Sequence, residues 1–173
     1  DHQPPVRDAI DFQDYLVKNT FISCWHKNTE ESMVMWSMYG KDQNSVAIQT
    51  TIERLKESVN PASLTGNSLW LKKVLYENAD AIDGVLLYED CFFRKRRHFS
   101  FEKEVRISLD TYSNECPRKD TPDGYELNVS MDTLIHKVLV HPDSKPWFLD
   151  AIKSVSAIYK LKADVEKGEF GYE

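Results

Sequence analysis

The segment RKRRHFSFEKEVR, residues 94–106, concentrates residue types that could carry out chemistry. If its second half is a β-strand, Glu102, Glu104 and Arg106 project from one face, about 7 Å apart per step. Two carboxylates and an arginine could bind a ribose and a phosphate, or supply an acid/base and an electrostatic stabiliser. We therefore take Glu104 and Glu102 as candidate catalytic residues and Arg106 as a candidate ligand-binding residue. One alternative is the charged outer face of an edge strand. Another is that the segment serves folding alone, with Glu104 paired to Arg106.

The same segment begins with four consecutive cations, Arg94 to Arg97. Such a run could contact phosphate groups, and Arg96 is our candidate phosphate-binding residue within it. Cations also complement the negative end of a helix dipole. A solvated helix end is therefore the competing interpretation.

A second unusual segment, FISCWHKNTEESMVMWSMYG at residues 21–40, supplies aromatic side chains. Trp25, His26, Trp36 and Tyr39 could form the wall of a ligand pocket in which a base stacks. The alternative is packing, because a strand and an apolar helix usually bury such residues. Cys24 lies two positions from His26 and invites a thiol–imidazole pair, although a catalytic base normally comes from elsewhere in the fold.

Metal and cofactor sites are not predicted. The cysteines and histidines lack the paired spacing of metal ligands. The glycines are isolated, so neither a dinucleotide fingerprint nor a phosphate loop is present. We therefore expect no metal and no cofactor.

The bulk composition restricts the class of protein. A chain of 173 residues with 41% hydrophobic and 29% charged residues is typical of a globular protein, and the length fits one domain with residues 1–19 as an entry segment. A net charge of −6 argues against electrostatic binding of nucleic acid over the whole surface, and it is compatible with a local basic patch. Three widely spaced cysteines suit free thiols in a reducing compartment, which predicts a cytoplasmic protein.

No apolar run approaches the roughly 20 residues of a membrane span. The expected partners are a nucleotide or nucleic-acid ligand, or another protein, and not a membrane.

Strands and helices are expected to alternate along the chain. Patterns of β-branched and apolar residues predict strands over 20–26, 45–50, 70–76, 103–109, 135–140 and 162–167. Helices are predicted over 8–17, 29–39, 51–59, 82–98 and 145–159, with caps at Asn28, Thr50 and Ser144 and a buried, all-round apolar second helix. The predicted class is α/β (α+β mixed): a mixed β-sheet of about five strands with helices packed on its faces.

Four stretches of this sequence follow one another in a recognisable order: the segment at 21–40, then SVAIQTTIERL, KRRHFSFEKEVRISL and LIHKVLVHPDSKPWF. On these stretches, from Phe21 to Phe148, the chain resembles the mostly bacterial family called domain of unknown function 2971. The resemblance implies a preceding amino-terminal region, with a short strand containing lysine and tyrosine and an acidic turn, for which we expect no counterpart in the sequence given. The family has no settled activity, and some members look like companions of mobile-element or phage-defence genes.

A looser analogy concerns the E-x-E carboxylates, Glu102 and Glu104. They resemble those of ADP-ribosyltransferase-like enzymes, in which a glutamate binds the nicotinamide ribose and stabilises an oxocarbenium-like transition state. The expectation is thus a small enzyme or effector acting on a nucleotide or nucleic acid, with a link to phage defence or mobile elements. The alternative is a non-catalytic protein-interaction module.

Overall fold

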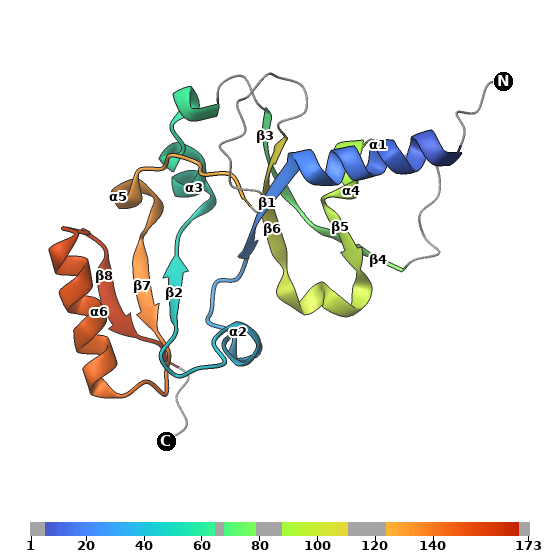
Figure 1. Ribbon diagram of the computed structural model, residues 1–173. Coiled ribbons are helices and arrows are strands. Elements are labelled where there is room, and N and C mark those ends of the chain that lie inside the picture. The colour runs from blue at the N-terminus through green and yellow to red at the C-terminus, as the bar shows by residue number, and fades with distance from the viewer. Residues whose placement is uncertain (1–5, 65–67, 79–87, 111–123, 170–173) are drawn as a thin grey trace. The chain divides into compact units, whose positions relative to one another are not determined.

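The computed structural model describes residues 6–64, 68–78, 88–110 and 124–169 (Figure 1). The chain divides into two compact units, the first made of Asp1–Lys27 and Leu64–Glu126, the second of Asn28–Ser63 and Leu127–Glu173. Helices and strands are both abundant, which confirms the α/β class. In the described part of the chain the strands form two sheets of three strands and one of two, so each sheet is smaller than the predicted five.

The first unit is built on an antiparallel sheet in the order β1-β6-β3. β1 (Thr20–His26) follows helix α1 (Val6–Asn19), and β3 (Ser68–Lys73) lies on the other side of the central β6 (Glu104–Asp110). Every residue of β6 except Ile107 is buried. The charged face of β6 is therefore enclosed, and the alternative of a solvated edge strand is wrong.

A two-stranded parallel sheet accompanies it, formed by β4 (Leu75–Glu77) and β5 (Arg94–Arg96). The predicted strand over 70–76 is thus two strands that are separated at Val74, whose amide donates to the Glu104 carbonyl at 3.0 Å. A change of pairing partner at this residue ends one strand and begins the next.

The helix predicted over 82–98 is wrong in its second half. α4 (Tyr88–Cys91) is a single turn, Arg94–Arg96 is the strand β5, and the short 3-10 helix η3 (Arg97–Glu102) follows; residues 79–87 lie outside the described residues. Pairing with β4 overrides the helical pattern, because tertiary hydrogen bonds outweigh intrinsic propensity.

The second unit contains the sheet β2-β7-β8. The central β7 (Lys137–Val140) is antiparallel to β2 (Val46–Gln49) and parallel to β8 (Asp164–Lys167), as expected when helix α6 (Pro146–Ile158) makes the crossover between β7 and β8. α6 contacts both strands, and Figure 1 shows it alongside β8. Val140 is fully buried at the centre of this sheet. The predicted final edge strand is confirmed.

Two further short helices of the second unit, α3 (Ile52–Ser58) and α5 (Met131–Leu134), pack against each other. The 3-10 helix η1 (Pro61–Leu64) follows α3 in the chain. Two predicted caps are displaced by one residue. Thr51 rather than Thr50 caps α3, accepting from the Arg54 amide at 3.2 Å, and Lys145 rather than Ser144 precedes α6 without a side-chain cap. Pattern reading places helix ends only within a residue or two.

Helix α2 (Met33–Tyr39) differs from its prediction in two respects. Ser32, not Asn28, caps it, and Glu31 accepts from the Trp36 indole at 3.0 Å instead of closing a capping box. The helix also has no fully buried residue, and Tyr39 is 64% exposed. Part of the apolar surface of α2 is therefore exposed to solvent. Among the described helices, none has the length and apolar character needed to cross a bilayer.

Candidate functional site

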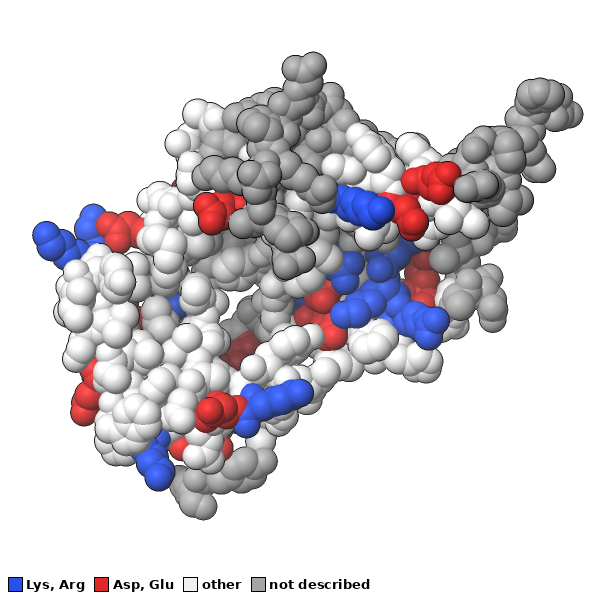
Figure 2. Space-filling model, in the orientation of Figure 1, with Lys and Arg blue, Asp and Glu red and all other residues white. Residues whose placement is uncertain are grey.

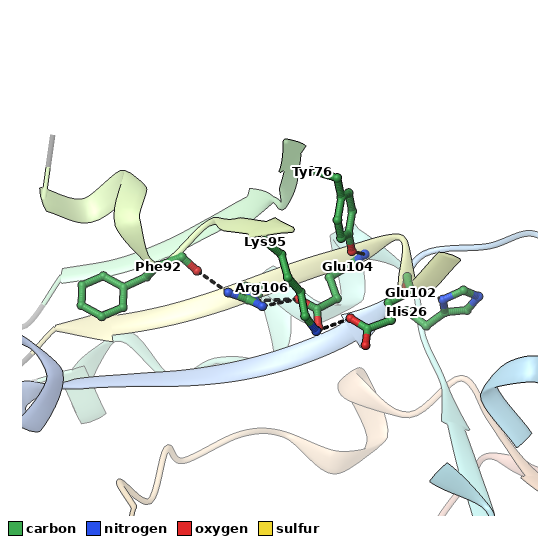
Figure 3. Close-up of polar contacts among 7 residues, drawn as sticks. All are labelled: His26, Tyr76, Phe92, Lys95, Glu102, Glu104 and Arg106. Carbon is green, nitrogen blue, oxygen red and sulfur yellow. Dashed lines mark hydrogen bonds and ion pairs between the residues drawn. The ribbon is translucent and has the colours of Figure 1, made fainter. Parts of the chain in front are cut away.

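Glu104 is the centre of a four-residue charge network in the first unit, which comprises Lys95, Glu102, Glu104 and Arg106 (Figure 3). Arg106, two positions along β6, donates to Oε2 of Glu104 from Nε at 2.7 Å, and its Nη2 forms an ion pair with the same oxygen at 2.5 Å. Nζ of Lys95 lies 3.2 Å from Oε1 of the same carboxylate. Both oxygens of Glu104 thus accept charge-assisted hydrogen bonds, the stronger kind in proteins.

Glu102 joins the network by a different route from the one predicted. It is the last residue of η3, and Lys103, in the left-handed conformation with φ 44°, separates it from β6. The prediction that Glu102 and Glu104 project from one strand is therefore wrong. The turn instead carries Glu102 to the ammonium group of Lys95, with which it forms an ion pair. Glu102 is 2% exposed and Glu104 8% exposed, so both carboxylates are enclosed.

Neighbouring groups contact three of the four network residues. The Tyr76 hydroxyl accepts from the backbone amide of Glu104 at 2.8 Å, and Nη1 of Arg106 donates to the Phe92 carbonyl at 2.7 Å. Nζ of Lys95 lies 4.8 Å from the centre of the Phe99 ring, within the range of a cation–π contact. The network is therefore held by strands β4, β5 and β6 together.

The network balances two carboxylates against two cations. Burial is the largest single effect on Glu104 and opposes its ionisation, but the hydrogen bonds from Lys95 and Arg106 together outweigh burial and hold the pKa of Glu104 below its ordinary value. Burial likewise opposes the charge on Lys95, and its bonds to Glu102 and Glu104 reverse this and raise the pKa of Lys95. At neutral pH Glu104 is thus an ionised stabiliser of positive charge and not a proton donor.

Cys24 and His26 lie on β1 opposite Arg106 and Glu104, respectively. Nδ1 of His26 is 2.5 Å from the Glu102 carbonyl oxygen, so this nitrogen is the donor and is occupied by the backbone. Burial and the charge of Glu104 raise the pKa of the Cys24 thiol. The structure thus gives Cys24 a neutral thiol and directs His26 to Glu102, an arrangement that does not favour a thiol–imidazole pair.

The predicted aromatic wall is divided between the two units. Trp25 lies on β1 in the first unit, where its indole donates to the Ser23 hydroxyl at 3.1 Å. Trp36 and Tyr39 belong to α2 in the second unit, where the Trp36 ring packs edge-on against His141 at 5.2 Å. Within the first unit, the structure brings His26 together with Glu102, Glu104 and Arg106.

The four cations of residues 94–97 have different environments. Arg94 ion-pairs with Glu77, and Lys95 belongs to the charge network. Arg96 and Arg97 are exposed, and neither forms an ion pair with any residue that the structure describes. Figure 2 shows basic and acidic atoms side by side in the region where Figure 1 draws β4 and β5. Two cations of this run are thus anchored and two are available.

Lys95 is the network residue that was not among the candidate site residues, and Tyr76, which accepts from the Glu104 amide, was not among them either. Residues 94–96 were predicted as part of a helix, but they form the strand β5. In a strand, the side chain of Lys95 points to the opposite face from those of Arg94 and Arg96. A strand interpretation of RKR would have separated Lys95 from Arg94 and Arg96, but its carboxylate partners depend on the tertiary structure.

No group of three potential metal ligands occurs within the described ranges. Comparison with family models, with curated proteins and with solved structures finds no match for this chain. The function must therefore be argued from the geometry of the site, and the resemblance to domain of unknown function 2971 remains a proposal.

Proposed function

We propose that this chain is a cytoplasmic effector, related to domain of unknown function 2971, that acts on a nucleotide or nucleic acid and binds its phosphates with Arg96 and Arg97. The observation that supports this proposal is the contrast within the basic run: Arg94 and Lys95 are fixed by carboxylates, while Arg96 and Arg97 are exposed without an ion-pair partner in the described part of the chain. Such an arrangement presents two cations from an anchored backbone.

Anchoring matters because binding costs conformational entropy. A cation on a backbone that is already fixed loses less freedom on contact with a phosphate than one on a mobile loop. The buried network costs desolvation free energy, so it is weak evidence for stability in its own right. Lys95, which belongs to the network, directly precedes Arg96 in the chain. The ion pairs of Lys95 with Glu102 and Glu104 therefore support a role for the network in positioning Arg96.

A catalytic role for Glu104 is the second candidate, favoured by its ionisation. A carboxylate that is charged at neutral pH could stabilise an oxocarbenium-like centre on a ribose, as in the ADP-ribosyltransferase-like analogy. Lys95 is the member of the network whose side chain is most exposed, at 25%. A substrate would therefore approach Glu104 from the side of Lys95 and replace its ammonium group.

Binding can be tested by calorimetry and thermal shift of the full chain with ATP, nicotinamide adenine dinucleotide and short single-stranded DNA and RNA. A ligand at 100 times its dissociation constant stabilises the native state by about 2.7 kcal/mol. We expect Arg96→Gln and Arg97→Gln each to weaken binding about tenfold, because each removes a charged hydrogen bond. Lys56→Gln, on the exposed surface of α3, is the control and keeps wild-type affinity.

Two outcomes would contradict the proposal. Binding with unchanged affinity in both arginine variants would show that these residues do not contact the ligand. Absence of binding to all four ligands would favour the alternative, a protein-interaction module that uses the same exposed cations. If Glu104→Gln retains ligand affinity but loses turnover of the dinucleotide, the catalytic candidate is supported.

A further inference from the structure

Two lysines lie on the face of the β1-β6-β3 sheet that is opposite to Glu104. Lys73 ends β3 and pairs with Val105 of β6. Lys27 follows β1 directly, and its amide donates to the Lys103 carbonyl at 3.0 Å, which continues the antiparallel pairing. Since side chains alternate along a strand, Lys27 and Lys73 both share the face of Val105, while Glu104 and Arg106 occupy the other.

Both lysines are exposed, and they extend from the two strands that flank β6. Neither lysine forms an ion pair with a carboxylate among the residues that the structure describes. Proximity to Lys73 lowers the pKa of Lys27, because two neighbouring ammonium groups repel each other. The strand register thus places two cations on the same face of the sheet, where a bound anion would remove their repulsion.

Trp25 extends this surface with an aromatic ring. It lies two residues before Lys27 on β1 and pairs with Val105, so it shares the face of both lysines. Its indole N–H donates to Ser23 and its side chain is half-buried, which restricts the ring. A restrained aromatic ring beside paired cations is the combination with which proteins hold a base and its phosphate.

We propose that Lys27 and Lys73 form a phosphate-binding site, with Trp25 available to stack on the attached base. The ligand chemistry is a phosphate group, whose source is a free nucleotide or a nucleic-acid backbone. This site lies on the opposite face of the sheet from the charge network and does not involve Arg96 or Arg97. This proposal can therefore be tested independently of the proposed function.

The test is calorimetry of the full chain with inorganic pyrophosphate, ATP and a short oligothymidylate. We expect Lys27→Gln and Lys73→Gln each to weaken binding of pyrophosphate about tenfold, and the double variant to lose little more, because both cations hold the same anion. Lys153→Gln on α6 is the matched control and retains wild-type affinity. Trp25→Ala weakens ATP and oligothymidylate but not pyrophosphate. Tighter binding of ATP identifies a nucleotide as the source, and tighter binding of the oligothymidylate identifies a nucleic acid.

Other outcomes separate the two proposals. Wild-type affinity in both lysine variants, together with weaker binding in the arginine variants, overturns this inference and leaves the proposed function standing. Pyrophosphate binding that depends on the lysines, without binding of any nucleotide or oligonucleotide, supports the lysine site and contradicts the proposed function. Absence of pyrophosphate binding to the wild-type chain overturns the lysine site. Far-UV circular dichroism and melting temperature confirm that the variants are folded.

Discussion

Arg106 and Glu104 form an ion pair along one strand: Nε and Nη2 of the arginine lie 2.7 and 2.5 Å from the same carboxylate oxygen. The two residues are two positions apart on the central β6, so the pleat brings their side chains to one face. Each is only 8% exposed. The pair is therefore part of the sheet interior, and the remaining oxygen of Glu104 accepts from Lys95.

Lys95→Met is expected to destabilise the first unit by about 3 kcal/mol, because it leaves two buried carboxylates with a single cation. Chemical denaturation monitored by tryptophan fluorescence measures the loss. Arg96→Met, one residue further along β5, is the matched control and changes the free energy of unfolding by less than about 0.5 kcal/mol. Equal stability of the two variants would show that the network does not contribute to folding.

Stability is expected to fall at acid pH in a way that depends on Glu104. Its pKa in the folded chain lies below the ordinary value of 4.5, since its bonds to Lys95 and Arg106 outweigh the effect of burial. The unfolded chain therefore binds the proton first, and the contribution to stability, present above about pH 4.5, is lost as the pH falls through the folded-state pKa. Urea titrations at several values of pH should show a shallower acid slope for Glu104→Gln, with Glu53→Gln on the surface of α3 as control. An identical slope in wild type and Glu104→Gln would contradict the assignment.

Cys24 is expected to react slowly with iodoacetamide at neutral pH, although the residue is exposed. Partial burial and, second, the charge of Glu104 raise the pKa of its thiol above the ordinary 9.0, and the thiolate is the reactive form. The midpoint of the alkylation rate against pH, followed by mass spectrometry of the Cys24 peptide, reports this pKa independently of access. Glu104→Gln should move the midpoint down. A midpoint at or below pH 9.0 in the wild-type chain would contradict this prediction.

Gly168→Ala is expected to destabilise the second unit by about 1 to 3 kcal/mol. A Cβ atom at this position would lie 2.6 Å from Oε2 of Glu31 and 3.0 Å from Cγ of Pro142. Glu31 is not free to move away without cost, because it accepts from the Trp36 indole and from the Glu169 amide, each at 3.0 Å. Thermal denaturation measures the loss, with Ala substituted at the exposed Lys167 as control. Wild-type stability in Gly168→Ala would mean that Glu31 can adopt another rotamer without loss.

The sequence predicted elements whose local signal was strong. The strand TFISCWH extends over Thr20–His26 as predicted, because β-branched and aromatic side chains dominate it. The alternation of Glu104 and Arg106 with Val105 and Ile107 correctly divided β6 into two faces. Strong local patterns thus predict elements and faces, whereas the central position of β6 depends on its pairing with β1 and β3.

What the sequence by itself determined is the α/β class, the two-residue period that pairs Glu104 with Arg106, and the concentration of cations in residues 94–97. Tertiary structure alone decided that β6 is central, that Arg94–Arg96 is a strand, and that Lys95 joins Glu102 to Glu104. The physical reason is that period and propensity act between neighbours in the chain, while strand order and the partner of a buried charge depend on segments far apart in sequence. The ammonium group of Lys95 acquires its role only when β4 holds β5 beside the first residue of β6.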